Sequence, residues 1–489
     1  MAEYIPPLSE LVSWLYVMHA ADTSMYEAVS SYAASAHGFY ADELNRMVLL
    51  VEKTGCDPYT AVELTAEHSN NKEFRDFLSE YSTAVKTSGS PASYLASRLA
   101  SLRAEEKAAE EKRAASLAVF AEVFVSVFVA GVLFAVIVFL TLGVMNNASP
   151  LMLSAVVYGL LPLGTLGFLL AIDILYPSPP KQIKKTTAVN QSVTPSDKTE
   201  REILNRFSAY ERRKGFRKFL SSPAETLICR PYLTFICSIP AGSAVSAVLL
   251  LKSLVPAGIS LSIGLIIVFF PYVVFSFCKS SRISAAESEF PSVCRILSSA
   301  AGRGLTLSKG LSEAASNIHG VLGKELSAAV RDIRLCGGVY ESLGRLRDRL
   351  QIPSADRLTP LIQEASRRCR DMSYPFSLCA DEAAFSVERA VQRKSSMQLY
   401  VLIMYISYGV FIFVQFMLTG VFMDSFSALG NGVNISVFSG ILSDAVLIHG
   451  VCCGLAAGKL SGSGISGGIL HACILLSIGT AASAVMTIL

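Results

Sequence analysis

The sequence predicts an all-α, polytopic membrane protein with two homologous cytoplasmic helical bundles and about seven transmembrane helices. Of its 489 residues, 52% are hydrophobic and the mean hydropathy is +0.47, which is too apolar for a soluble protein of this size. Several apolar stretches reach the roughly 20 residues that a helix needs to cross a bilayer. Two polar parts of the chain also share a helical sequence pattern.

Seven apolar stretches qualify as spans: 118–142, 151–176, 231–254, 256–278, 398–423, 435–457 and 466–488. With the polar parts between them they predict six regions. These are a bundle at 1–116, two spans at 117–176, a basic linker at 177–230, two spans at 231–278, a second bundle at 279–397 and three spans at 398–489.

The distribution of basic residues predicts the orientation. The three polar parts hold 10, 12 and 18 Lys and Arg, which is 40 of the 42 in the chain. Because basic residues are retained on the cytoplasmic side, we expect all three parts and the N-terminus inside a multi-pass cell membrane protein. Seven spans then place the C-terminus outside.

The polar parts differ in net charge. Residues 1–116 carry 17 acidic and 10 basic side chains (net −7), 177–230 carry 5 and 12 (net +7), and 279–397 carry 13 and 18 (net +5). Opposite charges favour docking of the first bundle on the linker or on the second bundle, although ordinary solvated helix faces give the same counts. The basic helix predicted at 202–219 suits anionic lipid headgroups or a simple positive-inside anchor.

Both bundles show apolar residues at the 3.6-residue period of helices. The stripes are Leu44, Met47, Val48 and Val51, then Phe74, Phe77, Leu78, Tyr81 and Val85 in the first bundle, and Leu326, Ala329, Val330 and Ile333, then Leu358, Leu361, Ile362 and Ala365 in the second.

Two local matches suggest an internal duplication. VKTSGSPASYLASRL (85–99) aligns with IRLCGGVYESLGRLR (333–347), and AEEKAAEEKRA (104–114) aligns with ADEAAFSVERA (380–390). The offsets, 248 and 276, predict about 28 extra residues in the second copy near 351–379. No proline interrupts 92–140 or 380–416, so each bundle is expected to continue into its span as one helix, at about 1.5 Å per residue.

Motifs for catalysis are absent from the sequence. It contains no P-loop, HExxH or GxSxG pattern and no CxxC, so we expect no enzymatic activity, no cofactor and reduced cysteines. Three acidic residues fall within the spans: Asp444 centrally, and Glu122 and Asp173 near inner ends. Such residues contact another membrane helix or are satisfied by hydrogen bonds within the protein. His449 and His471 are expected to pack rather than to bind metal.

The paired bundles resemble the type II secretion F-type domain of assembly-platform proteins in type IV pili, type II secretion and the archaellum. The similarity is clearest in FPSVCRILSSAAGRGLTLSKGLSEAA (290–315) and VRDIRLCGGVYESLGRLRDRL (330–350). The final stretch GLAAGKLSGSGISGGILHACILL (454–476) and the order of bundles and spans look like the archaeal platform proteins.

This resemblance implies a non-enzymatic membrane platform that binds a hexameric secretion-type ATPase and helps pilin-like subunits leave the lipid membrane. It also implies a homodimer and no nucleic-acid partner. For the ATPase contact we predict arginines of the second bundle, because arginine pairs well with carboxylates. They are Arg331, Arg334, Arg345, Arg347, Arg349, Arg367, Arg368 and Arg370. The alternative functions are a secondary transporter and a membrane-bound sensor.

Overall fold

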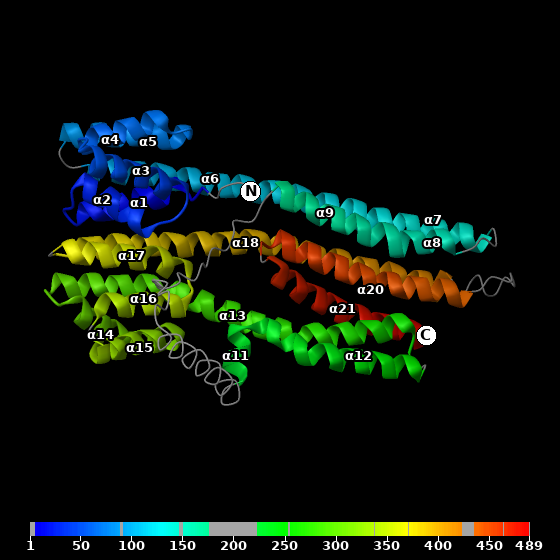
Figure 1. The fold of residues 1–489 in the computed structure, drawn as a ribbon. Coiled ribbons are helices and arrows are strands. Elements are labelled where there is room, and N and C mark those ends of the chain that lie inside the picture. Colours follow the sequence, from blue (N-terminus) through cyan, green and yellow to red (C-terminus); the bar gives the residue numbers. More distant parts are fainter. Residues whose placement is uncertain are drawn as a thin grey trace, which may run out of the picture. The chain divides into compact units, whose positions relative to one another are not determined.

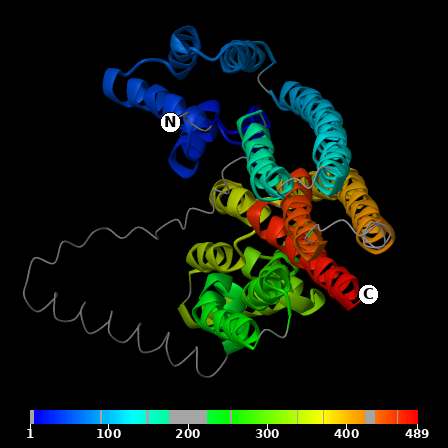
Figure 2. The same cartoon turned by 90° about the vertical axis from the view of Figure 1, so that its right-hand side faces the viewer.

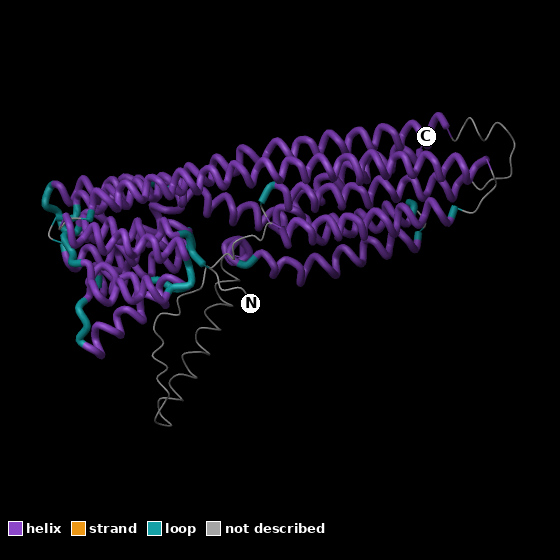
Figure 3. The backbone as a smooth tube through the Cα atoms, turned by 90° about the horizontal axis from the view of Figure 1, so that it is seen from above, coloured by secondary structure: helices purple, strands orange, loops and turns teal. Residues whose placement is uncertain are grey.

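The computed structural model describes residues 5–88, 91–145, 150–175, 223–252, 255–336, 338–369, 371–422, 435–462 and 464–488, and within these ranges the fold is helical (Figure 1, Figure 3). The described residues form two compact units. The bundle unit comprises those up to Glu111 and from Ser281 to Val391. The span unit comprises those from Lys112 to Leu175, from Pro223 to Ser280 and from Gln392 onward. Residues 177–222 of the basic linker, including the helix predicted at 202–219, lie outside the described residues.

Seven helices are long and apolar enough to cross a membrane, as predicted. They are Ala92–Leu142, Leu151–Leu175, Pro231–Leu251, Ala257–Gly302, Ser373–Gly420, Val437–Leu460 and Ser466–Met486. The chain is therefore an all-α, multi-pass membrane protein.

The bundle unit contains two repeats of six helices each. The first consists of α1 (Leu8–Ala20), α2 (Met25–Ser35), α3 (Phe39–Thr54), α4 (Pro58–His68), α5 (Lys72–Ser88) and the start of α6 (Ala92–Phe124). The second consists of the end of α13 (Ala257–Gly302), α14 (Leu307–Asn317), α15 (Gly320–Cys336), α16 (Val339–Leu350), α17 (Pro353–Arg368) and the start of α18 (Ser373–Met417).

The helices of the two repeats correspond at a nearly constant offset of 281 or 282 residues. Leu44 and Leu326 are buried at equivalent places in α3 and α15, and Phe77 and Leu358 in α5 and α17. The alignment of 85–99 with 333–347 was therefore wrong, as was the expected 28-residue insertion. That match compared the α5–α6 junction with the α15–α16 junction, because at both places the sequence has glycine between two helices.

Local sequence explains where the helices of the first repeat begin and end. Ser24 and Glu27 form a reciprocal capping box at the start of α2. Asp57 accepts hydrogen bonds from the backbone N–H groups of Tyr59 and Thr60 at the start of α4, where Pro58 occupies the first helical position. Gly55 ends α3 in the left-handed region, with φ of 66°.

The predicted continuity of the helices is confirmed and extends further than expected. Helix α6 is followed without a break by the π-helix η1 (Val125–Gly131) and α7 (Val132–Met145), and α18 is followed by the π-helix η4 (Leu418–Phe422). Helix α13 was not predicted to be continuous, yet it runs for 46 residues from a span into the second repeat. Pro271 and Pro291 lie within it, so proline does not end this helix.

The first pair of spans consists of α6–η1–α7 and of α8 (Leu151–Ser154), the π-helix η2 (Ala155–Leu160) and α9 (Leu161–Leu175). The second pair consists of α12 (Phe235–Leu251), preceded by α11 (Pro223–Cys229) and the 3₁₀-helix η3 (Pro231–Thr234), and of α13. The last group is α18, α20 (Ile435–Leu460) and α21 (Gly464–Ile488).

Helix α20 is the best-buried span, since 72% of its apolar segment is enclosed by the chain, against 17% for those of α12 and α13. Glycines let α20 and α21 approach closely. A Cβ on Gly458 would lie 2.0 Å from the Cα of Gly468, and one on Gly454 would lie 2.2 Å from the Cα of Ala472. Small residues at such crossings are how membrane helices gain van der Waals contact.

Candidate functional site: the seam between the two repeats

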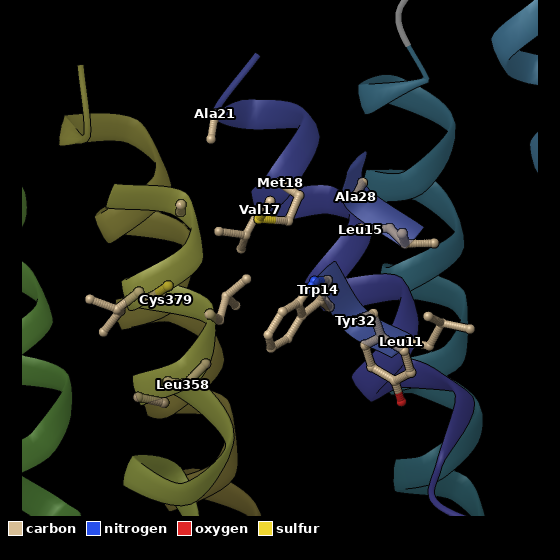
Figure 4. Close-up of a cluster of buried hydrophobic side chains, with 14 of the residues drawn as sticks. Leu11, Trp14, Leu15, Val17, Met18, Ala21, Ala28, Tyr32, Leu358 and Cys379 are labelled. Atoms are coloured by element: carbon tan, nitrogen blue, oxygen red, sulfur yellow. The ribbon is translucent and has the colours of Figure 1, made fainter. Parts of the chain in front are cut away.

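Within the bundle unit the two repeats share one hydrophobic core. Figure 4 shows its centre, where Trp14 and Val17 of α1 lie beside Leu358 of α17 and Cys379 of α18. All four are buried, and the indole N–H of Trp14 donates to the Ser31 hydroxyl at 3.0 Å. We call the contacts of α1, α2 and α6 with α17 and α18 the seam.

Charged side chains border this apolar centre. Three pairs join an acid of the first repeat to an arginine of the second: Glu10 with Arg357 at 3.4 Å, Glu27 with Arg368 at 3.2 Å, and Glu106 with Arg389. One pair has the reverse polarity, because Arg103 donates to Glu382 at 2.5 Å. Glu382 also lies 3.8 Å from Arg357.

The opposite net charges of the two bundles therefore meet at the seam, which confirms the predicted docking of the first bundle on the second. Pairs of this kind fix the register between two surfaces more than they add stability. Here they set the position of α1 and α6 against α17 and α18.

An aromatic ring adds to the ionic contacts. The guanidinium groups of Arg103 and Arg389 each lie 4.8 Å from the ring centre of Phe385 on α18. Both arginines thus combine a carboxylate partner with a cation–π contact. Lysine lacks the planar group that makes this double contact, so arginine is the residue that suits these positions.

Burial changes the titration of two carboxylates in the bundle unit. Desolvation raises the pKa of Glu10 above its usual value, although the Arg357 guanidinium opposes this. Desolvation likewise raises the pKa of Asp356, in the first turn of α17, to about 6, with Arg347 opposing and the nearby Asp348 and Glu287 carboxylates adding to the effect.

Four of the eight arginines predicted to bind the ATPase already have partners in the chain. Arg347 pairs with Asp348 at 3.1 Å, and Arg349 bonds Glu325 at 2.8 Å and Asp332 at 2.9 Å. The other pairs are Arg367 with Glu364 at 3.1 Å, with its guanidinium over the Tyr340 ring, and Arg368 with Glu364 at 3.7 Å in addition to Glu27.

Three of the eight are exposed and make no ion pair with the residues that the structure describes. They are Arg331, Arg334 and Arg345, and the last contacts only the Ser342 hydroxyl, at 3.5 Å. Arg370 lies outside the described residues. The structure thus separates the predicted set into arginines that hold the bundle together and arginines that face outward.

The acidic residues of the spans lie in different surroundings. The Tyr158 hydroxyl, on the π-helix η2, donates to Asp444 at 2.5 Å. Gly258, in the first turn of α13, leaves space for this carboxylate, since a Cβ there would lie 1.9 Å from Oδ1. Asp444 therefore joins one helix from each of the three groups of spans, and the expectation of an internally hydrogen-bonded aspartate is met.

The other two acids differ from each other. Asp173, at the end of α9, forms an ion pair with Lys459 of α20. Glu122 is exposed on α6 beside the exposed apolar side chains of Val119 and Val123, and it has no ion-pair partner in the described part of the chain.

The two histidines of the spans pack against aromatic residues. His449 is fully buried, with its ring 4.0 Å from that of Phe411, and His471 shares a 3.0 Å hydrogen bond with the Tyr405 hydroxyl. The Tyr408 hydroxyl donates to the backbone carbonyl of Val446 at 3.1 Å.

Sequence reasoning missed the residues of the seam as a group. The aligned stretches 104–114 and 380–390 contain Glu106, Glu382 and Arg389, but the alignment predicts no contact between them. They are also not equivalent positions of the two repeats, because at the offset of 281 Glu106 corresponds to Val387. The signal that was available was the opposite net charge of the bundles.

Comparison with known proteins supports this architecture. A family model described as type II secretion system (T2SS), protein F, matches residues 12–139 and again residues 293–420. The first and last residues of the second match are each numbered 281 higher than those of the first. Each match includes one helical repeat with the span that follows it. No curated protein and no solved structure matches the chain. Because the two matches together cover more than half of its length, the chain belongs to the type II secretion system protein F family, the assembly-platform proteins of type II secretion and type IV pilus-type machines.

Proposed function

We propose that this protein is the assembly platform of an archaeal type IV pilus-like filament machine, such as a pilus or an archaellum, and that it couples a cytoplasmic secretion ATPase to the extraction of pilin-like subunits. Membership of the family and the two repeats support a platform. The seven spans, with three of them after the second repeat, support the archaeal type. In this proposal the bundle unit lies in the cytoplasm, because it holds most of the basic residues outside the linker.

The continuity of α6, α13 and α18 carries the proposal of coupling. Each of these helices contains residues of both units, with no loop at the change from one unit to the other. A hexameric ATPase that binds the bundle unit would therefore act on helices that themselves enter the span unit. The seam adds to this, because it joins α6 to α18.

The span unit supplies candidate contacts for pilin-like subunits. A carboxylate on the lipid-exposed side of a span raises the free energy of membrane insertion by up to about 3 kcal/mol near the bilayer centre, and by less toward the interface. Glu122 is such a residue, and a cationic group on a single-span subunit would compensate its charge. Asp444 is already bonded to Tyr158, so we assign it to the packing of the spans rather than to the subunit contact.

Breaking the continuity of one helix tests the coupling. We expect insertion of Gly-Gly-Ser after Gln392 in α18 to abolish filament assembly, counted by electron microscopy of cells, while the ATPase still co-purifies with the protein. The control is the same insertion beside Gly304, in the turn between α13 and α14. Normal filament numbers with the α18 insertion would refute coupling through this helix.

A further inference from the structure

Two equivalent faces of the repeats differ in chemistry. Because the repeats correspond at an offset of 281 or 282, the hairpin α3–α4 of the first matches α15–α16 of the second. We call these the acidic face and the arginine face. The helices α3 and α4 carry five acidic residues against two basic ones. The acidic residues are Asp42, Glu43, Glu52, Glu63 and Glu67, and the basic ones are Arg46 and Lys53. On α15 and α16, six basic residues outnumber four acidic ones.

The arginine face has a compact centre. Arg331, Arg334 and Leu335 are spaced so that they share one side of α15. Leu335 is 83% exposed. The hydrogen bond from Arg349 holds the pKa of Asp332 below its usual value, and the charges of Arg345 on α16 and of Arg331 add to this effect. The exposed Leu335 side chain thus shares this hairpin with three arginines that form no ion pair with the residues described.

The acidic face carries the complementary features. Leu49, Leu50 and Leu64 are 46%, 37% and 37% exposed. Leu49 and Leu50 lie on α3 and Leu64 on α4, and we call these three exposed leucines of one hairpin the apolar patch. Glu52 and Glu67 are exposed on the same two helices and make no ion pair with the residues described.

The two faces cannot meet within one chain. The seam uses α1, α2 and α6 of the first repeat and α17 and α18 of the second, which leaves α3–α4 and α15–α16 outside it. Figure 1 shows these hairpins on opposite sides of the seam helices within the bundle unit, and the turned view agrees (Figure 2). A contact between these two faces would therefore join two molecules.

We propose that the arginine face of one copy binds the acidic face of a second copy, with Leu335 against Leu49, Leu50 and Leu64, and with Arg331, Arg334 and Arg345 opposite Glu52 and Glu67. The chain supplies both the charges and the apolar patch that such a contact needs, and the pairing repeats the polarity of the seam. The contact joins unlike faces, so copies associate head to tail, in a ring or a row. This inference is independent of the ATPase and of the pilin-like subunits.

Photo-crosslinking of the full-length protein tests the contact directly. The photoreactive residue p-benzoylphenylalanine replaces Leu335 in a chain with one affinity tag, co-expressed with a chain carrying a second tag. We expect adducts between the two tagged chains, with mass spectrometry placing them within residues 42–68. Arg331→Glu with Arg334→Glu should lower the yield about tenfold, a loss of about 1.4 kcal/mol.

Charge exchange provides the decisive comparison. A chain with Glu52→Lys and Glu67→Lys should also fail to crosslink with itself, whereas co-expression with the arginine-reversed chain should restore the adduct. Arg295→Glu, an exposed arginine on α13 of the same repeat, is the matched control and should leave the yield unchanged. Unaltered Trp14 emission would show that each variant keeps its fold.

Other outcomes overturn the inference. Adducts with a different protein and none between copies would make the arginine face a docking site for that protein, the ATPase included. Adducts with lipid, adducts elsewhere on the second copy, or no recovery on mixing the reversed chains would equally reject the proposed contact.

Discussion

The strongest test of the seam is removal of the charge on Glu382. This side chain is 8% exposed and contacts Arg103 at 2.5 Å and Arg357 at 3.8 Å. Glu382→Gln therefore removes the carboxylate partner of Arg103 and leaves Arg357 with Glu10 alone. Two limits bracket the expected loss. Breaking a fully buried ion pair costs about 3–5 kcal/mol, whereas breaking an exposed pair costs about 0–1 kcal/mol. The two arginines are about one quarter exposed, which places the expected loss near 2 kcal/mol.

Trp14 makes this loss measurable, because it is the only tryptophan in the chain and lies in the seam. Urea unfolding of the full chain in detergent, followed by Trp14 emission, should shift to a lower midpoint by about 1 M for a slope near 2 kcal/mol per M. Glu63→Gln is the control, since it breaks the ion pair between Glu63 and Lys86, two side chains that are about half exposed. The urea midpoint of this variant should hardly move. A double-mutant cycle with Arg103→Met isolates the pairwise energy. Equal midpoints for Glu382→Gln and Glu63→Gln would refute a stabilising role for this pair.

Three further predictions address other parts of the molecule. Asp356 has a pKa of about 6 in the folded protein, above the reference value of 3.8. Ionisation of Asp356 therefore lowers the stability progressively as pH rises from about 4 to 6, and it has no effect below about 4. Asp356→Asn should therefore stabilise the protein by about 1 kcal/mol at pH 7, with the advantage fading as pH falls from 6 to 4; a pH-independent difference in Tm would contradict this. Gly458→Ala forces α20 and α21 apart and should lower the free energy of unfolding in detergent by about 2 kcal/mol. Gly440→Ala on the same helix, with nothing within 4 Å of the new Cβ, should have almost no effect. Similar losses for the two variants would count against the close crossing. Tyr158→Phe deletes one hydrogen bond to Asp444 and should cost about 0.6–1.7 kcal/mol in the same assay, and full retention of stability would argue against that bond.

The sequence predicted the spans and the helical stripes well, because apolar length and a 3.6-residue period are local properties. The stripes at Leu44 and Leu326 are buried where expected. The repeat register was missed because turns look alike in short windows, and only the order of six helices separates the α5–α6 junction from the α15–α16 junction. Helix α13 was missed because a rise in polarity near residue 279 resembles a loop, although the backbone continues as a helix.

The functional residues were harder to predict, since pairing depends on tertiary contacts. Net charge correctly indicated that the two bundles attract each other, but it did not identify Glu106 or Arg389 as partners. Counting arginines gave eight candidates for an interface. Only the fold shows that Arg349 and Arg368 are used within the bundle unit, while Arg331 faces outward.

The 46-residue helix α13 gives the two repeats unequal freedom. Among the described residues, the second repeat is continuous with spans through two helices, α13 and α18, and the first repeat through one, α6. Rotation of the second repeat would require both of these connecting helices to bend or wind, whereas rotation of the first would deform α6. If the seam opened, torque applied to the second repeat would be transmitted through two continuous helices, and torque applied to the first through α6.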